Sequence, residues 1–107
     1  AAVPAGEREG IGDPAPPSAA YRAWLAEVYG DHAPQDDGAP LDPTALDRFT
    51  EAQLLWDRAF AEGIAAALER RPDALVVGII GGGHLQHRWG VPHQLAALGI
   101  DDVVTLL

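Results

Sequence analysis

The chain has 107 residues, enough for one small domain, and a formal net charge of -9. This acidic balance argues against nucleic acid as a partner, because surfaces that bind nucleic acids are usually basic. The absence of Cys excludes disulfides, thiolate nucleophiles and Cys-ligated metal sites. No apolar run in the sequence has the length of a membrane span, and no signal peptide is visible.

Prolines and glycines are frequent in residues 1–17, so this segment cannot sustain a helix or a central strand. We predict an extended lead-in that lies over another surface of the protein. The sequence also lacks Met and begins with Ala1. We therefore expect it to be a piece of a longer protein.

Residues 18–71 are predicted to form a helical segment with two helices. Ser18 is a suitable N-cap for the first helix, and a polar loop is expected over residues 31–40. Asp42 as N-cap and Pro43 at the first helical position predict where the second, long helix begins. This helix would run to about residue 70 or 71.

The long helix carries apolar side chains at alternating spacings of three and four residues, which predicts one buried stripe. Gln53 falls inside this stripe and would need a hydrogen-bond partner or a cavity. Gly63 costs about 1 kcal/mol relative to Ala inside a helix, so we expect another backbone or a ligand close to it. The predicted stripe consists of Leu46, Phe49, Trp56, Phe60, Ile64 and Ala67.

Residues 72–107 are predicted to form a βαβ unit, which makes the predicted fold class α/β. Residues 74–80 are a continuous apolar run, typical of a strand that is buried on both faces of a parallel sheet. A glycine-rich loop follows, then a short helix from Pro92 to Leu98 and a second strand over residues 103–107. Two parallel strands cannot bury both faces of a sheet, so we expect an incomplete piece of a larger α/β domain.

The glycine-rich loop is the predicted functional site, because open α/β sheets bind ligands at the C-terminal ends of their strands. Gly82 and Gly83 would allow a ligand to approach the backbone closely. Arg88 adds a fixed positive charge, and Trp89 adds a flat apolar face. An anion-bearing, partly aromatic ligand would suit this set. The alternative is a tight strand-to-helix turn that binds nothing.

The histidines of this loop differ in their predicted roles. His84 directly follows the glycines and is the best candidate for a ligand or an acid/base group. His87 is either a second ligand or solvated, and His93 could pair with an anion at a helix start or lie on the surface. The spacing of His84 and His87 could bind a divalent transition metal, provided that Asp, Glu or Tyr supplied further ligands.

A second candidate surface lies on the long helix, where Gln53, Trp56 and Asp57 share one side. This side either forms a wall of the ligand pocket or holds a core Trp whose polar neighbours tie down a loop. Tyr21 and Tyr29 are predicted to be core or interface aromatics. A buried tyrosinate can also ligate ferric haem, so both remain candidates for that role.

Two motifs resemble the ChaN-like family. Residues 53–61 (Gln-Leu-Leu-Trp-Asp-Arg-Ala-Phe-Ala) are similar to its Q-x-x-W-D-x-x-M-A helix, with Phe60 in place of the usual Met. Residues 76–84 and the later Gly-Val-Pro at 90–92 look like its G-x-G-H … G-[IV]-P segment. The family's upstream Gly-Glu-x-His motif is absent, so residues 1–107 resemble the C-terminal part of such a domain.

The resemblance implies a bacterial haem-binding protein of iron uptake, often a lipoprotein of the cell envelope, that can form a homodimer around haem. Haem would lie against Trp89, Trp56 and the helix that carries Tyr21. His84 or a Tyr would bind the iron, Arg88 would pair with a propionate, and the remainder of the parent domain would complete the pocket.

The resemblance also places the chain near the Tiki/TraB-like superfamily, where some members are metal-dependent hydrolases that use Glu and His. An alternative function is therefore a hydrolase in which His84 binds a divalent metal or acts as a general base. A third possibility is an interaction domain with an inert loop. Haem binding without enzymatic activity is the function that we expect first.

Overall fold

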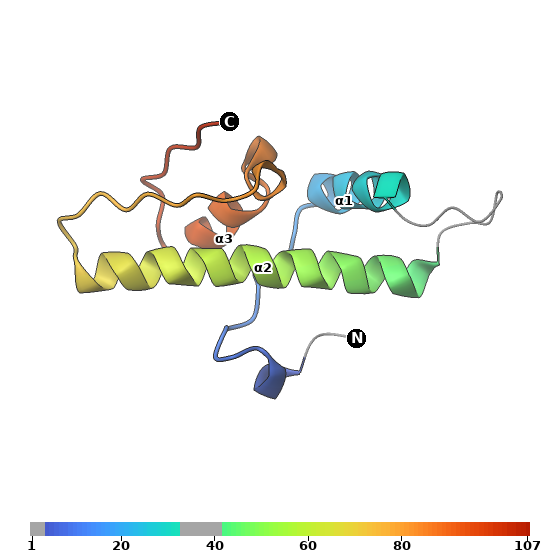
Figure 1. Ribbon diagram of the computed structural model, residues 1–107, viewed down its shortest axis with the longest axis horizontal. Helices are drawn as coiled ribbons and strands as arrows, with labels where there is room; N and C mark the ends of the chain where they lie inside the picture. Colours follow the sequence, from blue (N-terminus) through green and yellow to red (C-terminus); the bar gives the residue numbers. More distant parts are fainter. Residues whose placement is uncertain (1–3, 33–41) are drawn as a thin grey trace.

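The computed structural model of the protein describes residues 4–32 and 42–107 as helices joined by extended segments (Figure 1). α1 and α3 lie on the same side of the long helix α2, whereas η1 lies on the opposite side. Among the described residues, no helix combines the length and the apolar composition that crossing a membrane requires. The helices are η1 (Ala5–Glu7), α1 (Ala19–His32), α2 (Pro43–Arg70), η2 (Gly82–His84), η3 (Gln86–Arg88) and α3 (Val91–Ala97).

Side-chain caps fix the starts of α1 and α2 where the sequence predicts them. The Ser18 hydroxyl accepts a hydrogen bond from the Tyr21 backbone N–H at 3.0 Å. The Asp42 carboxylate accepts one from the Thr44 backbone N–H at 3.0 Å. Each cap satisfies an N–H group that the first turn of a helix leaves unpaired. The loop predicted over residues 31–40 falls mostly outside the described residues.

The buried side of α2 is rotated by one residue from the predicted stripe, or about 100° around the helix axis. Trp56 is 57% exposed, so the interpretation of this residue as a core Trp is wrong. No described residue approaches Gly63 either, since no described atom lies within 4 Å of where its Cβ would be, so the predicted close approach of another backbone is not seen. The buried positions of α2 are Thr50, Leu54, Asp57 and Ala61.

The predicted α/β fold is wrong, because the described residues contain no strand and no sheet. Segments 74–80 and 103–107 are extended, but no backbone hydrogen bond joins them. A strand buried on both faces needs pairing partners and cover on both sides. Here Leu75 and Ile79 are 90% and 98% exposed. The apolar run is therefore an unpaired extended segment with exposed aliphatic side chains. All regular secondary structure of the described residues is helical.

Two apolar clusters hold the helices together. The first is centred on Tyr21 and Leu25 and joins α1 to α2. The second is centred on Ala61 and Val91 and joins α2 to α3. On α2, the buried carboxylate of Asp57 lies between the residues that contribute to the two clusters. A carboxyl group thus occupies a position that is surrounded by apolar packing.

The lead-in is tied to α3 by side-chain hydrogen bonds. The Gln94 side chain accepts from the Ala15 backbone N–H at 2.8 Å and donates to the Ala15 carbonyl at 3.0 Å. His93, a predicted cofactor-binding residue, contacts the Pro16 carbonyl through Nε2 at 2.7 Å. A carbonyl oxygen only accepts, so this nitrogen carries the proton and donates. His93 is therefore engaged with the lead-in.

Candidate functional site

A chain of hydrogen bonds links α1, α2 and the glycine-rich loop. The Tyr21 phenol donates to Asp57 Oδ2 at 2.6 Å, and His84 Nδ1 lies 2.6 Å from Asp57 Oδ1. Asp57 is 0% exposed and Tyr21 is 1% exposed, whereas the His84 side chain keeps 21% of its surface accessible. We call these three residues the Tyr21–Asp57–His84 cluster. It has an interior end at Tyr21 and a solvent-facing end at His84.

The loop places His84 through two short 3-10 turns and one required glycine. The His84 backbone N–H donates to the Gly81 carbonyl at 3.0 Å, which closes the first turn. Further along, Gly90 is buried against the cluster. A Cβ on Gly90 would lie 2.4 Å from the His84 carbonyl oxygen and 2.9 Å from Asp57 Oδ1. Both contacts are closer than any side chain tolerates, so the loop can pack onto Asp57 only with glycine here.

The cluster sets the electrostatics of its own carboxylate and phenol. Burial raises the pKa of Asp57 above its ordinary value, while hydrogen bonds from Tyr21 and His84 act in the opposite direction. Burial is also the main cause that raises the pKa of Tyr21, and the hydrogen bond to Asp57 and its negative charge add to it. The phenol proton therefore stays on Tyr21, which acts as a donor.

The outer side of His84 faces an aromatic surface of α2. The His84 ring lies 5.5 Å from the Phe60 ring in an edge-on arrangement, and Phe60 lies 5.6 Å from Trp56. Trp56 is largely exposed. His84 Nε2 forms no hydrogen bond with any residue in the described part of the chain. An available imidazole nitrogen thus sits beside flat apolar surface.

Trp89 packs in a different aromatic group from Trp56. Its ring lies 6.3 Å from Tyr21 and 6.4 Å from Trp24, in the cluster between α1 and α2. The His87 ring stacks against Trp89 with a centroid separation of 4.3 Å. The structure therefore does not bring the two predicted tryptophans to one surface. It gives Trp89 an interior role and Trp56 an exposed one.

The remaining predicted residues lie in the loop or, in the case of Gln53, on α2. Gly82 and Gly83 form the exposed first 3-10 turn, with the Gly83 Cβ position 3.5 Å from Trp24. Arg88 donates to the Val103 carbonyl at 3.3 Å and is exposed. Gln53 is half-buried and shows no hydrogen bond to the described residues. Of this set, Arg88 alone brings a charge to the loop.

A metal site built on the predicted histidine pair has no third ligand in the structure. Residues 4–32 and 42–107 contain no group of three or more His, Asp and Glu side chains that could hold a metal ion. His84 Nδ1 is bound to Asp57, and the His87 ring stacks on Trp89. The two histidines therefore have separate partners.

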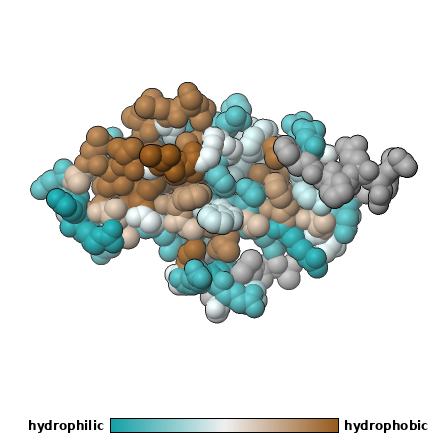
Figure 2. All heavy atoms as spheres, viewed as in Figure 1, coloured by the Kyte–Doolittle hydropathy of each residue, from teal (hydrophilic) through white to brown (hydrophobic). Residues whose placement is uncertain are grey.

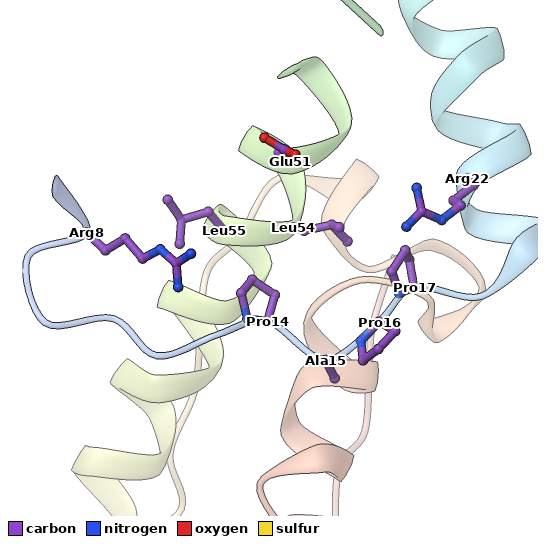
Figure 3. A pocket seen from close by; sticks show the side chains of 9 residues that line it. All are labelled: Arg8, Pro14, Ala15, Pro16, Pro17, Arg22, Glu51, Leu54 and Leu55. Atoms are coloured by element: carbon purple, nitrogen blue, oxygen red, sulfur yellow. The ribbon is translucent and has the colours of Figure 1, made fainter. Parts of the chain in front are cut away.

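Two hollows in the described part of the molecule are not lined by His84, although its neighbour Leu85 lines the larger one. A groove of about 650 Å³, lined mainly by aliphatic side chains, separates α2 and α3 from segments 74–80 and 103–107. A cavity of about 270 Å³ lies where the lead-in passes α2, between prolines and leucines (Figure 3). Arg8 and Arg22 contribute the positive charges of this cavity. Neither hollow includes a member of the Tyr21–Asp57–His84 cluster.

The structure gives central positions to two residues that the sequence did not place beside His84: Asp57, predicted on the second candidate surface, and Gly90, named only in the Gly-Val-Pro motif. Asp57 was assigned to the same surface as Trp56, although the spacing of Leu54, Asp57 and Ala61 also fits one helix face. A carboxylate at core spacing is the signal that could have identified it. Gly90 carries no such signal, because the need for glycine arises from a contact with α2 that is distant in sequence.

A family model described as haem-binding uptake, Tiki superfamily, ChaN matches residues 1–95 of the chain. The matched span includes the whole Tyr21–Asp57–His84 cluster and Gly90. It confirms the resemblance that the two sequence motifs suggested. Searches among curated proteins and among solved structures gave no match.

Proposed function

Because the chain belongs to the ChaN family of haem-binding uptake proteins, we propose that it binds haem through the Nε2 atom of His84. Imidazole is a common axial ligand of haem iron. The main support is the contact of His84 Nδ1 with Asp57 at 2.6 Å, which engages one ring nitrogen and leaves the other available. His84 would hold the haem, and the bound haem would supply the iron that this nitrogen binds.

His84 suits this role better than Tyr21 of α1. A tyrosinate ligand must lose its proton and reach the iron, but the Tyr21 side chain is buried and donates its proton to Asp57. The raised pKa of Tyr21, caused mainly by burial, opposes ionisation further. The His84 side chain is partly accessible, and it does not have to leave the interior or give up the hydrogen bond to Asp57 to reach a ligand.

The surface beside His84 matches the chemistry of a porphyrin. Phe60 and Trp56 extend from the imidazole along α2 as consecutive ring contacts, and Trp56 is mostly exposed. Large exposed aromatic side chains are typical of sites that bind apolar ligands. Arg88 follows in the same loop and is a suitable partner for a propionate carboxylate.

Haem titration followed by absorbance tests the assignment of the ligand. Loss of a residue that only supports a metal ligand weakens binding by roughly 10- to 100-fold. We expect His84→Ala to weaken haem binding by more than this and to alter the Soret band. His87→Ala is the matched control, because it removes an imidazole from the same loop and leaves the Asp57 contact intact. Equal affinity and equal spectra for the two variants would rule out His84 as the iron ligand.

A further inference from the structure

Asp57 is the one residue of the Tyr21–Asp57–His84 cluster that contacts both of the others. Its Oδ2 accepts a hydrogen bond from the Tyr21 hydroxyl of α1 at 2.6 Å. Its Oδ1 lies 2.6 Å from Nδ1 of His84 in the loop. Its side chain is completely buried. A buried carboxylate is costly unless its lone pairs are satisfied, so two short hydrogen bonds from different elements indicate a specific role for this group.

We propose that Asp57 and Tyr21 are positioning residues that hold the His84 proton on Nδ1 and direct the Nε2 lone pair toward the ligand. The proposal rests on the haem-binding function stated above, and it extends that function to two residues that would not contact the ligand.

The hydrogen-bond directions follow from the chemistry of the three groups. An ionised carboxylate only accepts, so Tyr21 must donate with its O–H and His84 must donate with Nδ1–H. A neutral imidazole that donates from Nδ1 has its lone pair on Nε2. The cluster therefore selects one of the two neutral tautomers of His84.

Tyr21 limits how the carboxylate can move. Because its O–H occupies Oδ2, Asp57 cannot rotate to offer that oxygen to His84 without breaking a bond of 2.6 Å. On the other side, Gly90 lies so close that a Cβ would be 2.9 Å from Oδ1. The Phe60 ring contacts the edge of the imidazole at 5.5 Å. The orientation of the His84 ring is therefore fixed from several directions.

A carboxylate partner changes the electronic character of the imidazole as well as its orientation. The negative charge of Asp57 makes the ring a stronger electron donor through Nε2. A stronger donor favours ferric over ferrous iron, so it lowers the reduction potential of a haem bound there. Removal of the charge should raise that potential.

The first test compares Asp57→Asn with Asp47→Asn, an exposed aspartate of the same helix. In the haem-free protein, nitrogen NMR should show His84 as the Nδ1–H tautomer in the wild type and in Asp47→Asn. We expect a mixture of tautomers in Asp57→Asn, because Asn has no charge and can turn its NH2 group toward the ring. With haem, this variant should show a higher reduction potential and about 10- to 100-fold weaker binding. A wild-type NMR spectrum for Asp57→Asn would overturn the proposal.

The second test uses Tyr21→Phe, which keeps the ring and removes only the donor to Asp57. Tyr29→Phe makes the same change on the same helix, where the ring packs on Phe49 at 5.2 Å. We expect Tyr21→Phe to shift the His84 resonances and to weaken haem binding about fivefold, as for the loss of one hydrogen bond. If both variants match the wild type, Tyr21 has no positioning role.

The outcomes separate this proposal from the proposed function. Unchanged haem binding by His84→Ala would refute the iron ligand, while the NMR of the haem-free protein would still report whether Asp57 selects the tautomer. Conversely, His84→Ala could abolish binding while Asp57→Asn leaves the tautomer and the potential unchanged. That result would support the haem ligand and refute the positioning role.

Discussion

Tyr21 combines an aromatic contact in the core with a hydroxyl that serves a buried carboxylate. Its ring stacks near Trp24 with a centroid separation of 6.1 Å, and its hydroxyl reaches Asp57. Burial and the nearby negative charge both raise the pKa of Tyr21. All seven basic side chains of the chain are Arg, so no lysine loses a proton in the same pH range. The protonation of Tyr21 should therefore be visible in the stability of the protein.

Alkaline pH should destabilise the protein through Tyr21. The pKa of Tyr21 in the folded state lies above its ordinary value of 10.0, so above about pH 10 the unfolded chain loses a proton that the folded chain keeps. The free energy of unfolding should then fall by about 1.4 kcal/mol per pH unit, while below pH 10 this contribution is complete. Urea denaturation between pH 8 and about 11 measures the slope, which Tyr21→Phe should lack and Tyr29→Phe should retain. Identical slopes for both variants would contradict this origin.

At the scale of single residues, the sequence predicted that Asp57 shares a helix side with Trp56 and either lines a pocket or ties down a loop. The structure shows Asp57 bound to His84 of the glycine-rich loop, whereas Trp56 is exposed. His84 could be predicted because it follows three glycines in a loop. Asp57 was placed with Trp56 because the aromatic residues of α2 dominated the choice of helix face. The buried face instead carries smaller side chains, among them Ala61, which allow α3 to pack closely. Hydrophobicity alone could not reveal this rotation of the helix.

Among the elements, α3 acts as the anchor of the lead-in. The side-chain amide of Gln94 pairs with both backbone groups of Ala15, and Gln94 is 1% exposed. A neutral amide can donate and accept at once, which is what a backbone N–H and C=O together require. The lead-in is also held by the His93 contact with the Pro16 carbonyl and by a hydrogen bond from the Gly12 N–H to Glu62 of α2.

Substitution of Gln94 should therefore loosen the lead-in. We expect Gln94→Ala to lower the free energy of unfolding by about 1–3 kcal/mol, because it leaves backbone groups of Ala15 without partners. Gln94→Glu is the informative companion, since a carboxylate still accepts from the N–H but cannot donate to the carbonyl. Both variants should also show faster proteolysis within residues 4–17. Protection equal to the wild type would mean that other contacts hold the segment.

The helix ends could be predicted, whereas the extended segments could not. Capping depends on neighbours within a few residues, so Ser18 and Asp42 determine the starts of α1 and α2 locally. Pairing of strands depends on segments far away in the chain. The apolar run at 74–80 therefore led to a predicted sheet that the described residues do not form.

At the scale of the whole molecule, the described residues form a strongly apolar surface at one end. Figure 2 shows hydrophobic residues gathered at one end of the molecule, where segments 74–80 and 103–107 lie near the C-terminal half of α2. Leu75, Ile79 and Leu106 expose most of their side chains there. Apolar surface of this kind favours association in water. The net charge of -9 opposes it at long range.

We expect the chain to self-associate through this face at high concentration. Leu75→Glu together with Ile79→Glu should shift sedimentation velocity profiles toward the monomer. The control is Ala66→Glu, which adds a negative charge at an exposed position of α2. Glu69, which is also exposed on α2, stays as it is. The difference between the double variant and the control should be clearest in high salt, where repulsion between the acidic chains is screened. A double variant that associates as strongly as the control would place the contact elsewhere.

Asp57 also has a consequence for how the molecule opens. If α1 or the glycine-rich loop detached alone, the buried carboxylate would lose one of its two donors while it remained surrounded by apolar side chains. Such a partial opening carries the penalty of an unsatisfied charge, so α1, the loop and the middle of α2 should separate together. Segments that are distant in sequence thus form one cooperative unit, and a ligand held at His84 would slow the exchange of amide hydrogens in α1.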